Sequence, residues 1–151
     1  MFPVSVESLS DLLIRDSEAA LLRASERYHL SGFAYVFEVG QAHPCFYLAI
    51  DTGPSPCHAS TGEWTHPAGG FEGAQMSDDW NRYYALLDAY MTEDDAHESR
   101  INEVHAFFRS VMKRIRARWA PRLPQCAFTV NETADSDAVV EATYTEINER
   151  L

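Results

Sequence analysis

The chain has 151 residues, of which 46% are hydrophobic and 12% are aromatic. A chain of this length and composition can bury a packed core, which excludes disordered, collagen-like and low-complexity classes and predicts a single domain over 1–151. Twelve Lys and Arg residues stand against 23 Asp and Glu residues, so the net charge is −11. This charge repels phosphate backbones and anionic lipids, and we expect no binding to nucleic acid or membrane surfaces.

The sequence also bears on the cellular compartment. Its first residues lack a basic stretch followed by an apolar one, and no apolar run approaches the roughly 18 residues of a membrane-spanning helix. The three cysteines are Cys45, Cys57 and Cys126, an odd number without a Cys-x-x-Cys pair. We therefore expect a cytoplasmic protein with reduced thiols.

The first predicted element is a helix over 8–29. Apolar side chains recur there at helical spacing, Ser8 or Ser10 can cap the start, and Gly32 can accommodate the turn that follows the end.

A hairpin is predicted next. Segment 33–39 is aromatic and β-branched and is apolar on both faces until Glu38, while 45–51 has a similar composition. The five residues 40–44 suit a hairpin loop, so these strands should pair antiparallel.

The segment 52–76 contains Gly, Pro, Ser, Thr and His without a period, which predicts a long loop. A short strand near 63–65 is the alternative. At Ser77 a helix is expected to begin, because a capping serine is followed by two aspartates.

Residues 92–95 resemble a capping box for a long helix that reaches about Trp119 and ends before Pro121. On its apolar stripe lies His105, which is interpreted as a hydrogen-bonded core residue.

The C-terminal part predicts a third strand over 126–131. A last helix should follow from 135–137, although a strand over 138–145 also fits the pattern. The fold class is therefore α+β: a small antiparallel sheet, made of the hairpin and the strand near 126–131, packs against about four helices, with helix predominant.

Chemical motifs are weak in this sequence. His43, Cys45, Cys57, His58 and His66 are ligand types that zinc accepts, but their spacing matches no usual zinc site, and no metal or cofactor is expected. No phosphate-binding loop or nucleophile elbow occurs. The protein is therefore interpreted as non-enzymatic. The alternatives are a small enzyme built around Cys57 and His58 in the 52–76 loop, and a homo-oligomeric scaffold.

An acidic, aromatic surface between the loop and the helix that follows it is the predicted binding region. Tyr90 lies off the apolar stripe of that helix and should be exposed, and exposed aromatics beside carboxylates often anchor interfaces. The candidate partner-binding residues are Trp64, Phe71, Asp78, Asp79, Tyr90, Glu93 and Asp94. For the carboxylates among them, the capping of predicted helix starts is the favoured interpretation.

The order of elements resembles a family of small acidic bacterial proteins that look like immunity proteins of bacterial toxin systems. The residues that carry the resemblance are 33–37, 46–52, Trp64, 79–81 and 147–148. The resemblance implies a cytosolic, non-enzymatic protein that binds a cognate toxin, and it supplies no catalytic motif. Together with the net charge, it leads to the hypothesis of an inhibitor that occludes a basic partner protein, such as a toxin domain.

Overall fold

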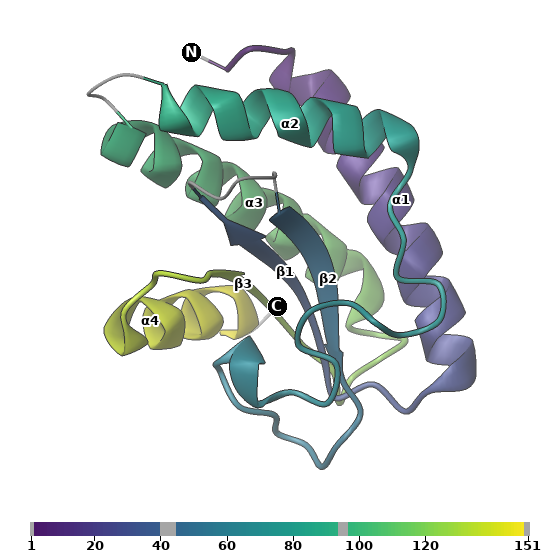
Figure 1. Cartoon of the computed structure of the whole chain (residues 1–151). Helices are drawn as coiled ribbons and strands as arrows, with labels where there is room; N and C mark the ends of the chain where they lie inside the picture. Colours follow the sequence, from purple (N-terminus) through teal and green to yellow (C-terminus); the bar gives the residue numbers. More distant parts are fainter. Residues whose placement is uncertain (1, 40–44, 94–96, 150–151) are drawn as a thin grey trace.

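The computed structural model describes residues 2–39, 45–93 and 97–149. It is an α+β fold in which helix predominates, as the sequence predicts (Figure 1). In chain order, the elements are α1 (Val6–Arg27), β1 (Gly32–Glu38), β2 (Cys45–Asp51), the short 3₁₀ helix η1 (Thr61–Glu63), α2 (Asp78–Thr92), α3 (His97–Trp119), β3 (Ala127–Glu132) and α4 (Asp137–Asn148).

The three strands form one mixed sheet in the order β2–β1–β3. β1 and β2 pair antiparallel, as predicted, while the hairpin loop 40–44 lies outside the described residues. β3 instead runs parallel to β1, which corrects the prediction of a wholly antiparallel sheet. The parallel direction follows from the place where β3 joins the sheet. The Ala127 N–H donates to Ser31 O at 3.0 Å, so β3 enters the sheet where β1 begins and follows its direction.

β1 is the central strand and is buried on both faces as far as Glu38. Phe33, Tyr35 and Phe37 belong to the main core, together with side chains of α1, α2 and α3. On the opposite face, Val36 belongs to a smaller cluster under the Trp64 ring. This second face is the one on which a pocket opens.

Another segment of the chain contacts each outer edge of the sheet. Asn148 of α4 donates to Phe128 O at 2.8 Å and accepts from the Phe128 N–H at 2.9 Å, so α4 lies along the free edge of β3 (Figure 1). Beyond β2, Ile50 and His66 exchange backbone hydrogen bonds of 3.1 and 3.0 Å. These contacts satisfy edge groups that would otherwise be open to pairing with another chain.

Two predicted helix starts are confirmed by their caps. Ser77 Oγ accepts from the Trp80 N–H at 3.2 Å, and α2 begins at the next residue. Ser136 Oγ accepts from the Val139 N–H at 3.3 Å and begins α4, which excludes the strand alternative over 138–145.

Other boundaries differ from the prediction. α1 begins earlier, because Ser5 is its cap and neither Ser8 nor Ser10 serves that role. In place of a strand near 63–65, the chain forms η1. The capping box over 92–95 falls partly outside the described residues. Within the ranges that the structure describes, none of the helices combines the length and apolarity that a membrane crossing requires.

Candidate functional site

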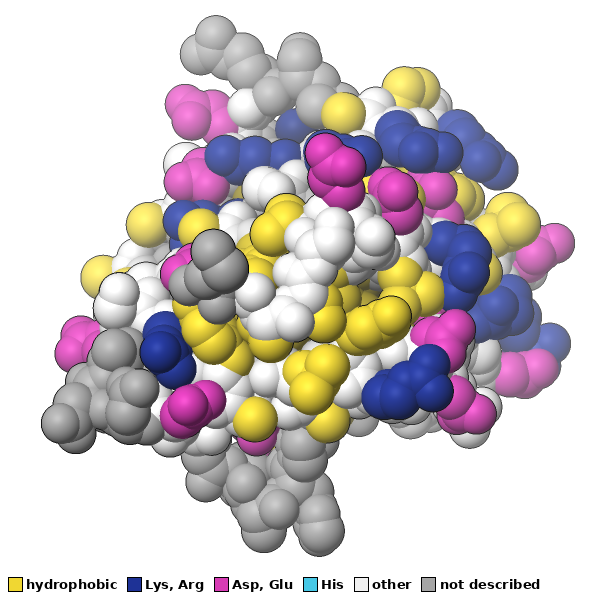
Figure 2. Space-filling model, turned by 90° about the horizontal axis from the view of Figure 1, so that it is seen from above, with side chains coloured by type: hydrophobic (Ala, Val, Ile, Leu, Met, Phe, Trp, Pro, Cys, Tyr) yellow, Lys and Arg dark blue, Asp and Glu magenta, His cyan; other side chains and the backbone are white. Residues whose placement is uncertain are grey.

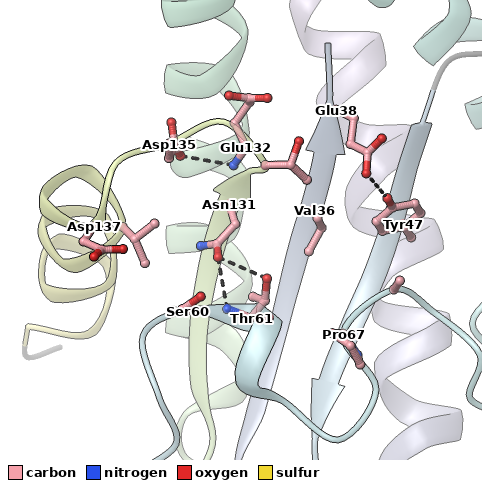
Figure 3. A pocket seen from close by; sticks show the side chains of 14 residues that line it. Val36, Glu38, Tyr47, Ser60, Thr61, Pro67, Asn131, Glu132, Asp135 and Asp137 are labelled. Atoms are coloured by element: carbon pink, nitrogen blue, oxygen red, sulfur yellow. Dashed lines mark hydrogen bonds between the residues drawn. The ribbon is translucent and has the colours of Figure 1, made fainter. Parts of the chain in front are cut away.

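A pocket of about 300 Å³ opens on the second face of the sheet (Figure 3). Val36 and Asn131, which are partners in the β1–β3 pairing, lie on its floor. Its walls come from η1, from residues 67–68 and from the start of α4. The pocket therefore lies where the ends of the two parallel strands meet the covering segments.

Four acidic residues line this pocket, and none of its described lining residues is Lys, Arg or His. Glu38 ends β1 and Glu132 ends β3, while Asp135 and Asp137 lie at the start of α4. Parallel strands bring their carboxyl ends to one edge of a sheet, so residues that are distant in sequence lie near one another there (Figure 3). The side chain of Glu132 lies on the core face of the sheet with Val130 and Phe37, so its carboxylate points away from the pocket floor. We call this site, defined by the four acids, the carboxylate pocket.

Hydrogen bonds hold three of the four carboxylates in place. The Tyr47 hydroxyl donates to Glu38 Oε1 at 2.6 Å. The Ala134 N–H donates to Glu132 Oε2 at 3.1 Å, and the Glu132 N–H donates to Asp135 Oδ2 at 3.1 Å. The fold itself therefore fixes the orientation of these three carboxylates.

The clustered charges repel one another. Burial raises the pKa of Glu132, and the negative charges of Asp135 and Glu38 raise it further. Burial and Glu38 also raise the pKa of Tyr47, so its hydroxyl remains a donor at neutral pH. A cationic group in the pocket would relieve this repulsion.

Only the oxygen of the Asn131 side-chain amide has hydrogen-bond partners in the described part of the chain. Its Oδ1 accepts from the Thr61 N–H at 3.1 Å and from the Thr61 hydroxyl at 3.0 Å, and the N–H donor fixes which way the amide points. Its Nδ2 is turned away from Thr61 and has no hydrogen-bond partner in the described part of the chain, although Asn131 is only 5% exposed (Figure 3). A buried donor without a partner is uncommon in folded proteins.

His105 of α3 lies against Asp135. The distance from His105 Nε2 to Asp135 Oδ2 is 3.6 Å, and His105 Nδ1 lies 2.6 Å from Arg109 Nη1. Burial lowers the pKa of His105, Asp135 and Glu146 oppose this shift, and Arg109 reinforces it. The prediction of a hydrogen-bonded core histidine is confirmed.

The aromatic residues that were predicted as interface anchors are buried. Trp64 is 4% exposed and donates from Nε1 to His58 O at 2.7 Å. Phe71 belongs to the main core. Tyr90, which was expected to be exposed, is 8% exposed, and its hydroxyl donates to Glu103 at 3.1 Å. The prediction of an exposed aromatic surface is therefore wrong, because all three rings complete core packing.

The predicted acidic residues do not gather into one surface. Asp78 and Asp79 are exposed in the first turn of α2, where Asp79 pairs with Arg82. Glu93 follows the last turn of the same helix, roughly 20 Å away, and Asp94 lies outside the described residues. On the side of the molecule that carries α2, acidic and basic side chains are interleaved around apolar ones (Figure 2). This mixed surface contrasts with the carboxylate pocket.

Cys57, the nucleophile of the alternative enzymatic hypothesis, is half-buried. Burial raises the pKa of its thiol, and a hydrogen bond from Tyr144 opposes that shift. The net upward shift keeps the thiol protonated at neutral pH, which is unfavourable for a nucleophile.

The candidate metal ligands Cys45, Cys57, His58 and His66 are described, whereas His43 is not. Within the described ranges, no group of three or more His, Cys, Asp or Glu side chains is arranged to hold a metal ion.

Comparison with known proteins adds no assignment: no family model, no curated protein and no solved structure matches the chain. A functional proposal therefore has to rest on the charge of the chain and on the geometry of the pocket.

Sequence patterns alone do not reveal the pocket. Glu38 stands out only as the polar residue that ends an apolar strand, and Asp135 and Asp137 as parts of a helix cap. Asn131 and Glu132 end a second apolar strand in the same way. This shared pattern is a usable signal only once β1 and β3 are known to be parallel neighbours.

Proposed function

We propose that the protein is a non-enzymatic binding protein that occludes a basic partner protein, in the manner of an immunity protein or antitoxin. The observation that supports this proposal best is the carboxylate pocket, whose described lining residues include four acidic residues and no basic one. The net charge of −11 also favours a basic partner, because it attracts positive charge at long range.

Occlusion requires affinity and coverage, and it requires no chemical step from this chain. Long-range attraction raises the association rate, while close contacts in the pocket slow dissociation. A stable interface buries about 1,600 Å² in total, far more than one pocket supplies. We therefore place the pocket at the centre of a wider contact that includes the neighbouring surfaces of η1 and α4.

The test is a pull-down from the native host with a tagged copy of the chain, at low and at high salt. We expect one basic protein in stoichiometric amount, with association slowed at high salt because ions screen the attraction. The purified partner should lose its own activity when the chain is added. Failure to recover a partner at either salt concentration, or turnover of a small molecule by the chain alone, would contradict the proposal.

A further inference from the structure

The two ring nitrogens of the buried His105 face side chains of opposite charge. Nδ1 lies 2.6 Å from Arg109 Nη1, on the same helix, and Nε2 lies 3.6 Å from Asp135 Oδ2, in the turn before α4. A guanidinium group has hydrogen-bond donors only, so Nδ1 is the acceptor of the bond with Arg109. The neutral ring therefore carries its hydrogen on Nε2.

The Nε2–H group of this neutral form makes no hydrogen bond. A separation of 3.6 Å exceeds the usual length of an N–H···O bond, and Nε2 has no other partner in the described part of the chain. Asp135 Oδ2 accepts instead from the Glu132 N–H at 3.1 Å. The ring therefore has a carboxylate within reach to which it is not yet bonded.

A proton on Nδ1 would reverse these two relations. Nδ1 would then carry a hydrogen that faces the donors of Arg109, so the present bond is lost and two positive charges become neighbours. The positive charge would at the same time strengthen the attraction between Nε2–H and Asp135. Arg109 has another acceptor, because its Nε lies 3.3 Å from Glu146 Oε2 on α4.

We propose that His105 is a proton-operated switch between two contacts: on protonation it leaves Arg109 of its own helix and bonds Asp135, which ties α3 to the turn that begins α4. Asp135 also lines the carboxylate pocket, so one wall of the pocket responds to the same proton. The switch is a property of the fold and does not rest on the proposed function.

The groups around the ring set the pH at which the contacts exchange. The charged residues come from α3, the end of β3, the turn and α4, and they are Arg109, Glu132, Asp135 and Glu146. β1 presents the uncharged Phe37 ring. Burial lowers the pKa of His105 from its ordinary 6.5, the positive charge on α3 lowers it further, and the carboxylates of the turn and α4 oppose the shift. The exchange should therefore occur below pH 6.5.

The test is a pH titration of the isotope-labelled full-length chain, followed by long-range ¹H–¹⁵N NMR of the histidine rings. At pH 8 we expect His105 to carry its hydrogen on Nε2. Its titration midpoint should lie below those of the exposed His29 and His58, which serve as internal controls. The Asp135 carboxyl and Glu132 amide signals should shift with the same midpoint as His105.

Three variants separate the two contacts. Arg109→Met keeps the apolar part of the side chain, and it should raise the His105 midpoint by roughly 1 pH unit and allow hydrogen on Nδ1 in the neutral ring. Asp135→Asn should lower the midpoint by roughly 1 pH unit and leave the hydrogen on Nε2. Lys113→Met is the control, because Lys113 Nζ contacts the same Glu146 at 3.0 Å. It should leave the tautomer unchanged and move the midpoint much less than Arg109→Met.

Different outcomes overturn different parts of the proposal. A neutral His105 with its hydrogen on Nδ1 in the wild-type chain would overturn the bond from Arg109. Asp135 and Glu132 signals that do not follow the His105 midpoint, or an unchanged midpoint in Asp135→Asn, would overturn the exchange. Equal midpoint shifts in Arg109→Met and Lys113→Met would show that only the net charge near α4 matters.

Discussion

Glu132 ends β3 in a half-buried position, and its pKa is raised by burial and by the charges of Asp135 and Glu38. The ionised side chain therefore weakens folding. Glu132→Gln keeps the size of the side chain and an acceptor for the Ala134 N–H while it removes the charge. We expect this variant to have a higher free energy of unfolding than wild type at pH 7, as measured by urea denaturation.

The increase in the free energy of unfolding that Glu132→Gln produces should depend on pH. A carboxyl whose pKa is raised in the folded state destabilises the fold as pH rises from its ordinary pKa of 4.5 through the folded value. Below pH 4.5 both states are protonated, and Gln and Glu become equivalent. The difference should therefore be clear at pH 7 and small at pH 4, while Glu26→Gln should show little difference at either pH. An equal gain at both pH values would contradict the account.

The contribution of His105 to stability should change with pH in the opposite direction, falling as the pH falls. Its pKa is lowered from the ordinary 6.5, chiefly by burial, so its neutral form stabilises the fold above that pH. This contribution is lost as pH falls below 6.5 towards the folded pKa. We expect His105→Gln to cost about 1–3 kcal/mol at pH 7 but to lose less stability than wild type between pH 7 and pH 5. Parallel pH curves for the two proteins would argue against a buried neutral imidazole.

At the scale of elements, the 52–76 segment is fixed to the sheet by a close approach of Trp64 to Gly32. A Cβ at position 32 would lie 2.8 Å from the Trp64 ring, within steric overlap. Gly32→Ala should therefore displace the ring and lower the free energy of unfolding by about 1–3 kcal/mol. Urea denaturation followed by far-UV circular dichroism measures this loss.

A double variant tests the contact itself. Trp64→Leu should lower the free energy of unfolding by less than the roughly 3–5 kcal/mol typical of Trp→Ala, because it leaves a smaller cavity above Val36. Gly32→Ala combined with Trp64→Leu should cost less than the sum of the single variants, since the smaller side chain leaves room for the new methyl group. Additivity within about 0.5 kcal/mol would show that the two positions do not interact.

The elements differ in how far the sequence predicts them. The starts of α2 and α4 follow local hydrogen bonds from Ser77 and Ser136, so a short stretch of sequence is sufficient. The β1–β2 pair follows from two similar segments close together in the chain. The parallel pairing of β1 and β3 depends on where α3 delivers the chain, and no local pattern records that.

The candidate site was missed for the same reason. The spacing of Tyr90 could place it on a helix but could not assign it to the core. Its burial depends on tertiary contacts, such as those of its ring with Phe2 and of its hydroxyl with Glu103. The carboxylates of the pocket come from β1, β3 and the start of α4. Their convergence is a property of the tertiary fold.

At the scale of the whole molecule, the acidic residues occur in two different settings. Over the surface that carries α2, opposite charges alternate, so its local field is weakened (Figure 2). Around the carboxylate pocket, the charged residues among the described lining are all acidic. Net charge should therefore govern the rate of association with a basic partner, and the pocket should govern the rate of dissociation.

The most direct test compares three tagged baits in the native host at physiological salt. The first is wild type, the second carries Glu38→Gln and Glu132→Gln, and the third carries Glu7→Gln and Glu26→Gln, which remove the same charge from exposed positions on α1. We predict that wild type and the α1 variant recover the same basic protein, and that the pocket variant recovers at least about tenfold less. Equal recovery by all three baits would contradict the central claim that the carboxylate pocket holds the partner.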